Sequence, residues 1–142
     1  MKAARILLAA GASGSGKTLI TCGLLQALVN RGLKTASFKC GPDYIDPMFH
    51  SRVIGAKSRN LDTFFTDRET TKYLFCENAA DCDISVMEGV MGFYDGVAGT
   101  TTKASAYDLA SVTDTPVILI VNSRGMSVSL AAYVKGFMEY RK

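Results

Sequence analysis

Residues 11–18 constrain the fold more than any other part of the sequence. They read Gly-Ala-Ser-Gly-Ser-Gly-Lys-Thr and fit the pattern G-x-x-x-x-G-K-[ST], in which backbone N–H groups and the start of a helix surround phosphate oxygens. An apolar run at 5–10 precedes the loop, and apolar residues at helical spacing follow it to residue 31. The order strand, glycine-rich loop, helix predicts a site for a nucleoside triphosphate. The predicted phosphate-binding residues are Gly11, Ala12, Ser13, Gly14, Ser15, Gly16, Lys17 and Thr18.

The same loop argues against a dinucleotide cofactor. A dinucleotide fingerprint needs a third glycine after Gly14 and Gly16, and Leu19 stands at that position. Lys17 is instead placed to neutralise the β- and γ-phosphates, and Thr18 offers a hydroxyl to Mg²⁺. The loop therefore favours a magnesium–nucleoside triphosphate complex over NAD or FAD.

Strands and helices are predicted to alternate along the chain. Apolar runs predict strands at 5–10 and 116–121, and two further strands are predicted at 34–39 and 84–87. Helices are predicted at 18–31, 66–78, 104–112 and 127–140. Thr66 and Glu69 form a capping-box pattern at the second helix, whereas Gly41, Pro42 and Pro47 indicate a loop after the second strand. The alternation predicts one α/β domain over 1–142, P-loop NTPase-like, with a mostly parallel sheet and helices on both faces.

Composition limits which binding partners and which cellular compartment are expected for the chain. A chain of 142 residues with 48% hydrophobic residues can bury one core, and a net charge of +3 does not favour a nucleic-acid partner. The first apolar run is too short for a signal core or a membrane span. Four cysteines without C-x-x-C spacing, beside the single His50, do not supply a structural zinc site. We expect reduced thiols and a cytoplasmic protein without a membrane partner.

Charged residues follow the predicted strands. Because parallel strands end at one edge of the sheet, Glu88 should emerge beside the phosphate loop and serve Mg²⁺. Lys39, Asp43 and Asp46 follow the second strand in the same way and can bring metal, phosphate and a carboxylate together. The two aspartates can also be simple turn formers.

One histidine and several loop aromatics have two readings each. His50 is either a substrate contact or, as is more common for a lone histidine beside a phenylalanine, a packed structural residue. Tyr44, Phe49, Phe93 and Tyr94 either face a planar ligand or pack within loops.

Three segments together resemble a known family. They are residues 11–18, residues 38–50 (Phe-Lys-Cys-Gly-Pro-Asp-Tyr-Ile-Asp-Pro-Met-Phe-His) with Asn-Leu-Asp at 60–62, and residues 87–96 (Met-Glu-Gly-Val-Met-Gly-Phe-Tyr-Asp-Gly). The chain resembles the amino-terminal, ATP-binding part of the cobyrinic acid a,c-diamide synthases, which are related to dethiobiotin synthetases. The resemblance implies ATP-dependent amidation of two acetate groups of a corrin through an acyl phosphate, with ATP and Mg²⁺.

The resemblance also implies roles for single residues. Thr18, Asp43 and Glu88 would hold the metal, and Lys17 and Lys39 would act on the phosphates and the reacting carboxylate. By the same resemblance, Asp46 and Asp95 would order the substrate loops and Asn122 would contact the adenine edge, while Lys103 and Arg124 would meet the other carboxylates of the corrin. Tyr44 and His50 stay candidate substrate contacts on the grounds given above. Members of this family carry a carboxyl-terminal glutamine amidotransferase domain, which nothing in the sequence matches, so we expect an amino-terminal fragment.

Other functions stay open from sequence. A dethiobiotin synthetase-like ligase also activates a carboxylate-type intermediate with MgATP, but residues 41–50 argue against it. A partitioning-type switch ATPase would carry a second lysine directly after the first loop glycine, where this chain has Ala12. The sequence leaves open a homodimer, activity of the fragment alone, and the choice among cobyrinic acid, its hydrogenobyrinic analogue and a nickel-containing tetrapyrrole.

Overall fold

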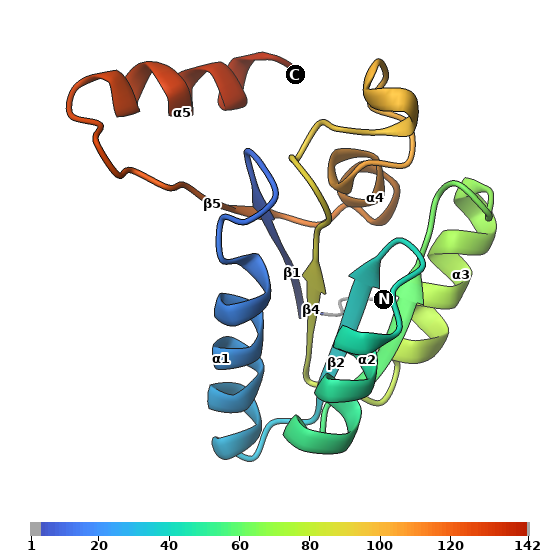
Figure 1. Cartoon of the computed structure of the whole chain (residues 1–142). Helices are drawn as coiled ribbons and strands as arrows, with labels where there is room; N and C mark the ends of the chain where they lie inside the picture. The colour runs from blue at the N-terminus through green and yellow to red at the C-terminus, as the bar shows by residue number, and fades with distance from the viewer. Residues whose placement is uncertain (1–3, 142) are drawn as a thin grey trace.

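A single parallel sheet forms the centre of the molecule. A computed structural model describes residues 4–141, and within them five parallel strands lie in the order β3-β2-β4-β1-β5 (Figure 1). The strands are β1 (Ala4–Ala10), β2 (Thr35–Cys40), β3 (Lys57–Leu61), β4 (Ile84–Glu88) and β5 (Val117–Ile120). All of them end at the edge that is uppermost in Figure 1.

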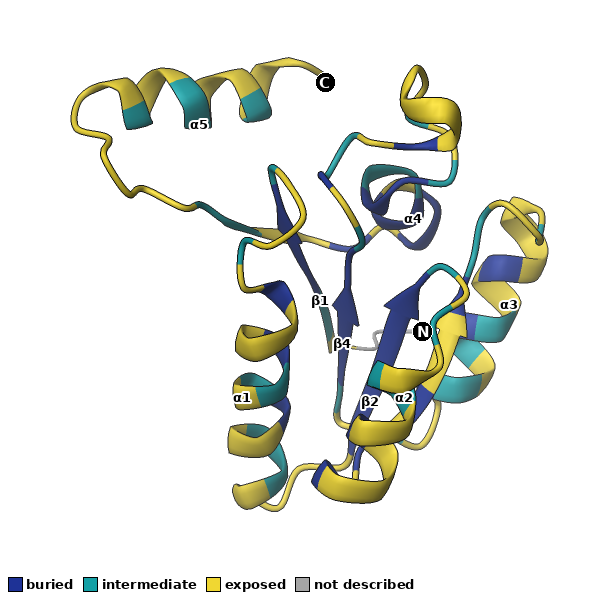
Figure 2. Ribbon diagram, viewed as in Figure 1, coloured by how far each residue is buried: buried dark blue, intermediate teal, exposed yellow. Residues whose placement is uncertain are grey.

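Helices cover both faces of the sheet. The helices are α1 (Lys17–Asn30), α2 (Ile45–Phe49), α3 (Arg68–Ala79), α4 (Ala106–Thr113) and α5 (Ser129–Glu139), with a π-helical turn at His50–Ile54 and a 3₁₀ turn at Val97–Gly99. Successive strand residues point to opposite faces. Accordingly, Leu7 packs with Phe75 of α3 and Leu109 of α4, whereas its neighbour Leu8 packs with Leu25 of α1. The predicted three-layer α/β/α fold is confirmed. Strand β2 is buried throughout, β4 is buried after its first residue, and β1 is buried over its last four residues (Figure 2).

The last helix lies apart from these layers. Figure 1 shows α5 above the carboxyl ends of the strands, joined to β5 by an extended segment, and α5 contains no buried residue. Its contact with the rest of the domain is aromatic: Tyr94 stacks on Phe137 with ring centroids 5.7 Å apart, and its hydroxyl donates to the Phe137 carbonyl at 2.7 Å. Of the two readings of Tyr94, the structure shows packing between loop and helix.

Two local predictions were wrong. The segment after β2 is not a continuous loop, because α2 includes Pro47 in its first turn, where a missing N–H removes no intrahelical hydrogen bond. The helix predicted from residue 66 begins at Arg68, with Asp67 as the capping residue: its side chain accepts from the Thr70 N–H at 2.7 Å. The Thr66 hydroxyl instead donates to the Asp62 carbonyl.

The prediction also lacked strand β3. This edge strand, Lys-Ser-Arg-Asn-Leu, buries only Ser58 and Leu61, so its sequence has neither an apolar run nor a clean alternation. No helix in residues 4–141 combines the length and apolar character that crossing a membrane requires.

Candidate active site

The phosphate loop has the conformation that its glycines allow. Gly14 and Gly16 adopt left-handed backbone angles, with φ of 74° and 85°, which cost little only for glycine. Helix α1 then begins at Lys17, and no side chain caps its first turn, so the N–H groups there are available to an oxygen ligand. A cavity of about 490 Å³ opens in front of the loop, and its walls include Lys39, Asp43 and Glu88.

Glycines also bring the β4–α4 loop against the phosphate loop. A Cβ atom on Gly92 would lie 2.7 Å from the Gly11 carbonyl oxygen and would overlap the Asp95 carboxylate. That carboxylate accepts from the Gly92 N–H at 3.0 Å. Asp95 therefore holds the loop after β4, and its expected role in ordering substrate loops stays a prediction. A Cβ atom on Gly11 would overlap the hydroxyl of Tyr133 on α5.

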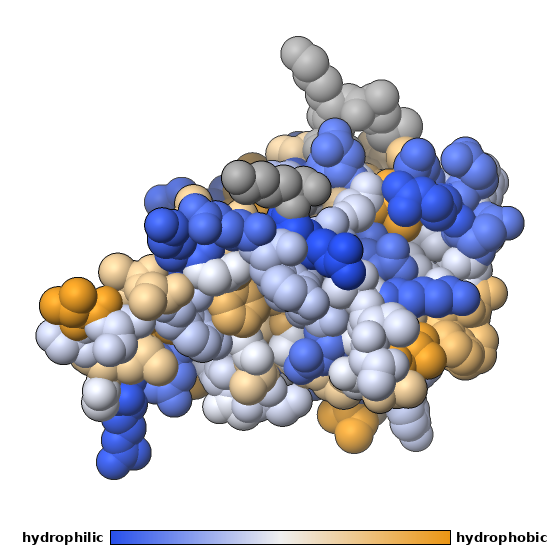
Figure 3. Space-filling model, turned by 90° about the horizontal axis from the view of Figure 1, so that it is seen from above, coloured by the Kyte–Doolittle hydropathy of each residue, from blue (hydrophilic) through white to orange (hydrophobic). Residues whose placement is uncertain are grey.

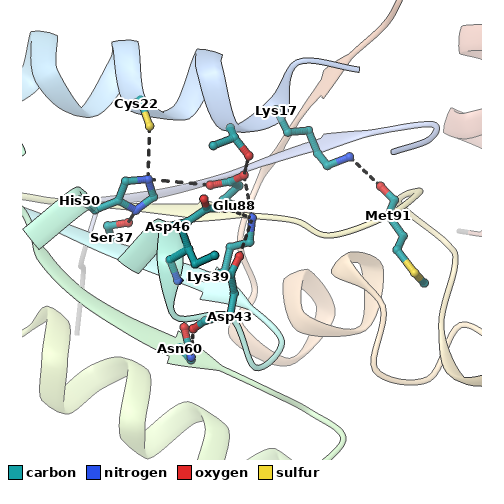
Figure 4. Close-up of polar contacts among 12 residues, drawn as sticks. Lys17, Cys22, Ser37, Lys39, Asp43, Asp46, His50, Asn60, Glu88 and Met91 are labelled. Atoms are coloured by element: carbon teal, nitrogen blue, oxygen red, sulfur yellow. Dashed lines mark hydrogen bonds and ion pairs between the residues drawn. The ribbon is translucent and has the colours of Figure 1, made fainter. Parts of the chain in front are cut away.

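Lys17 bridges the two loops. Its ammonium donates to the Ala12 carbonyl at 3.0 Å and to the Met91 carbonyl at 2.8 Å, the second of which is drawn in Figure 4. Burial and the nearby positive charge of Lys39 lower the pKa of Lys17. A triphosphate would replace two neutral carbonyl partners with anionic oxygens, which form stronger, charge-assisted hydrogen bonds.

Glu88 and Lys39 form the buried centre of the site. Glu88 ends β4 and is 0% exposed; its Oε1 accepts from Thr18 Oγ1 at 2.6 Å and from Lys39 Nζ at 2.8 Å. Lys39 faces Glu88 across the paired strands and also donates to Asp46 at 2.7 Å. Burial would lower the pKa of Lys39, but its hydrogen bonds to Asp46 and Glu88 outweigh burial and raise it. Lys39 is therefore a charged lysine held by carboxylates.

Asp43 stabilises the turn before α2, and both Asp43 and Asp46 form ion pairs with Lys39. Asp43 accepts from the Ile45 N–H at 2.9 Å and lies 3.7 Å from Lys39. Burial opposes ionisation of Asp43, but the hydrogen bond from Ile45 and the charge of Lys39 keep its pKa below the usual value. Asp43 lines the cavity, and Asp46 ties α2 to Lys39.

His50 lies behind this cluster rather than in the cavity. It is 0% exposed, contacts Ser37 through Nδ1 at 2.8 Å and Cys22 through Nε2 at 3.5 Å, and its Nε2 is 3.9 Å from Glu88 Oε2 (Figure 4). Burial lowers its pKa, against the charge of Glu88. The structure places His50 as a packed, hydrogen-bonded residue, the second of its two readings.

The structure does not bring the other predicted contacts to this cavity. Tyr44 is 77% exposed and lines an adjoining apolar cavity, and Lys103 borders a third cavity. Asn122 and Arg124 lie in the exposed segment after β5, where the Asn122 side chain accepts from the Arg124 N–H at 3.1 Å. Their assignment to adenine and to substrate stays a prediction.

Three residues of the site had no assigned role from sequence. Met91 contributes a carbonyl oxygen to Lys17 and adopts a left-handed φ of 47°. Asn60 donates from its side chain to the Asp43 carbonyl, and Ser37 contacts His50. Asn60 belongs to the Asn-Leu-Asp motif at 60–62, and this motif was the only sequence feature that pointed to it. A contact through a backbone carbonyl cannot be predicted from residue type.

The donor set fits Mg²⁺ that arrives with a nucleotide. Glu88 Oε2 is buried without a hydrogen-bond partner among residues 4–141, and Thr18 adds a hydroxyl. The described residues contain no group of three or more His, Cys, Asp or Glu side chains that could hold a metal by themselves. Mg²⁺ commonly uses one or two carboxylates together with phosphate oxygens and water, and this arrangement matches that pattern.

Comparisons with known proteins agree with the geometry. Residues 6–136 match the family model described as the CobQ/CobB/MinD/ParA nucleotide binding domain. The chain is 47% identical over 140 residues to the cobyrinate a,c-diamide synthase of Thermoplasma volcanium, covering 99% of this chain and 31% of that protein. It is 46% identical over 136 residues to the hydrogenobyrinate a,c-diamide synthase of Streptomyces coelicolor, covering 96% and 28%.

A solved structure supports the fold alone. The hydrogenase maturation factor HypB from Archaeoglobus fulgidus superposes with a TM-score of 0.51 at 14% identity, over 96% of this chain and 91% of that one. The chain spans less than a third of the two synthases.

Proposed function

Because the chain belongs to the CobQ/CobB/MinD/ParA family of nucleotide-binding domains, we propose that it is the ATP-binding and carboxylate-activating part of a cobyrinate a,c-diamide synthase. In this proposal it binds MgATP and phosphorylates the a- and c-acetate carboxylates of a corrin, which ammonia then converts to amides. Lys39 carries the argument, since it lines the phosphate cavity and lies 3.7 Å from Asp43, which that cavity shares with a second, apolar cavity beside it.

The apolar cavity suits a bulky substrate with carboxylate groups. It has a volume of about 460 Å³ and shares Asp43, Val90 and Met91 with the phosphate cavity. Its other walls include Pro42 and Ile45. A carboxylate that enters from this side would reach the wall that the two cavities share at Asp43, next to Lys39.

The chemistry requires positioning and charge neutralisation more than proton transfer. A carboxylate oxygen of the corrin forms a bond to the γ-phosphorus while the bond from that phosphorus to the bridging oxygen breaks, which releases ADP. Ammonia then attacks the acyl carbon, phosphate leaves, and one ammonia proton ends on the phosphate. The attacking carboxylate is already ionised and needs no base. Lys17 and Lys39 would hold the two anions together against their repulsion.

Magnesium would add charge neutralisation to this site. Thr18, Glu88 and Asp43 are the residues that would hold Mg²⁺, which stabilises charge on the transferring phosphoryl oxygens. In the structure, Lys39 occupies the Oε1 side of Glu88. We propose that Lys39 turns toward the phosphoryl group when metal and nucleotide bind.

The supply of ammonia belongs to another part of the protein. None of the four cysteines lies in a glycine-flanked strand-to-helix turn, the setting of a glutaminase nucleophile. We propose that a glutamine amidotransferase domain outside these residues provides ammonia, and that the chain by itself uses free ammonia.

Trapping the acyl phosphate tests this function directly. The chain, cobyrinic acid, MgATP and hydroxylamine should give a corrin hydroxamate with one ADP released per hydroxamate. Lys17→Ala should abolish ATP binding in calorimetry. Glu88→Gln and Asp43→Asn should still bind ATP but form no hydroxamate, and Lys72→Ala, an exposed lysine of α3, serves as the control. ATP hydrolysis without hydroxamate in the unaltered chain would refute the proposal, and full activity of a carboxylate variant would refute its role.

A further inference from the structure

A third cavity lies along the same edge of the sheet, on the side away from the phosphate loop. It measures about 450 Å³ and lies between the β3–α3 loop, the residue Lys103 and helix α4. Strand β3 pairs with β2, and β2 pairs with β4, so that Asn60, Lys39 and Glu88 lie in register. Two strand spacings amount to about 10 Å. This cavity and the phosphate site thus lie within the reach of one large substrate.

The walls of this cavity carry unpaired cations and exposed aromatic rings. Phe64 and Phe65 are 56% and 71% exposed and form an edge-to-face pair with centroids 5.0 Å apart. Arg68 and Lys103 are exposed, and their side chains make no hydrogen bond or ion pair with the other described residues. Figure 3 views the molecule from above the carboxyl ends of the strands and shows hydrophobic and hydrophilic residues interspersed on this face.

The loop that presents the two rings is held in place. The Thr63 hydroxyl donates to Asp108 of α4 at 3.0 Å, and the same Asp108 oxygen accepts from the Ala104 N–H at 2.8 Å. Asp62 accepts from the Phe64 N–H at 2.8 Å. The two acidic residues that line the cavity are Asp67 and Asp108, and both accept hydrogen bonds from backbone N–H groups, Asp67 from Thr70 and Asp108 from Ala104. Arg68 and Lys103 are the charged side chains of the cavity that have no such partner among the described residues.

From this arrangement, and resting on the proposed function, we infer that the Phe64–Lys103 cavity binds the part of the corrin that does not react. The rings of Phe64 and Phe65 would contact the apolar edge of the macrocycle, and Arg68 and Lys103 would pair with carboxylates other than the two that are amidated. Cation pairs on both sides of the substrate, Arg68 and Lys103 here and Lys17 and Lys39 at the phosphate, match a polyanion with carboxylates around its rim. Binding at this distance from the reacting group fixes its position.

Calorimetric titration of the chain with two corrins tests the inference. One probe is cobyrinic acid, and the other is a corrin in which all rim carboxylates are amides. Arg68→Ala and Lys103→Ala should each lower the affinity for cobyrinic acid by about tenfold and leave the affinity for the amidated corrin unchanged. Phe64→Ala should lower the affinity for both corrins. The matched controls are Lys72→Ala, one turn beyond Arg68 on α3, and Tyr73→Ala, an aromatic residue of α3 that is 65% exposed. Neither control should change either affinity.

The outcomes separate this inference from the proposed function. Unchanged affinity for cobyrinic acid in the Arg68→Ala/Lys103→Ala double variant, with binding by the unaltered chain intact, overturns the cavity assignment and leaves the proposed function standing. Absence of corrin binding by the unaltered chain overturns both. MgATP affinity should stay constant in every one of these variants, and its loss would show that the changes act on the phosphate site instead.

Discussion

Replacing Lys39 with methionine should be more damaging than the loss of any exposed ion pair. Lys39 Nζ lies 2.8 Å from Glu88, 2.7 Å from Asp46 and 3.7 Å from Asp43. Asp43 and Asp46 keep 31% and 20% of their side-chain surface exposed, so water can solvate them without Lys39. Glu88 is fully buried and has no such access. Lys39→Met should therefore lower the free energy of unfolding by about 3–5 kcal/mol, the cost of a buried charge left without its partner.

A second substitution should recover much of that loss. Glu88→Gln alone should cost about 1–3 kcal/mol, because a charged hydrogen bond to Lys39 is replaced by a neutral one while Asp46 still pairs with the lysine. In the double variant no charge is buried alone. The double variant should then be more stable than the sum of the single changes predicts by about 2 kcal/mol.

Urea denaturation followed by circular dichroism, without nucleotide, measures all three variants. Lys72→Met is the control and should stay within about 0.5 kcal/mol of the unaltered chain. If the costs of Lys39→Met and Glu88→Gln simply add, to within about 0.5 kcal/mol, the two side chains do not interact as described and the reasoning is refuted.

Three further predictions follow from contacts described above. Burial and the charge of Asp62 raise the pKa of the Cys40 thiol from 9.0 to about 12, so its contribution to stability is complete below pH 9.0 and is lost as pH rises toward 12; Cys40→Ala should flatten this alkaline loss in urea titrations, and an unchanged slope would contradict it. Asp67→Ala should lower the melting temperature because α3 loses its N-terminal cap, whereas Asp67→Asn should keep most of the stability that the cap contributes. Equal melting temperatures for the two variants would argue against capping. Gly92→Ala should weaken MgATP binding by about tenfold or more because its Cβ would displace the Gly11 carbonyl, while Gly23→Ala on the open side of α1 should not, and equal affinities would show that the two loops are not coupled.

Much of the fold could be predicted because its signals are local. Strands β1 and β4 contain short apolar runs, and the loop at 11–18 follows β1 directly. Parallel strands then dictate that Lys39 and Glu88 end at the same edge, and the structure brings them to 2.8 Å. Strand β3 escaped prediction because an edge strand that buries two side chains needs no apolar pattern.

The site was less predictable where its contacts are not local. Which carbonyls hold the Lys17 ammonium depends on how the β4–α4 loop folds back, and no residue type records this. The burial of His50 follows from the π-helical turn at His50–Ile54, which has no sequence signature of its own. Charge clusters near the ends of strands could be identified, but not which of their members turn inward.

The bridge from Lys17 to Met91 has a consequence for the order of binding. Met91 holds a left-handed backbone angle that a side-chain-bearing residue adopts at a cost of about 1 kcal/mol or more, and its carbonyl is one of the two that a triphosphate would displace from Lys17. Met91 also forms part of the wall of the apolar cavity. We therefore expect nucleotide binding to release that wall, so that ATP associates first and the acceptor second. A dead-end analogue of the acceptor should then inhibit uncompetitively against ATP, and noncompetitive inhibition would show that the two substrates do not bind in this order.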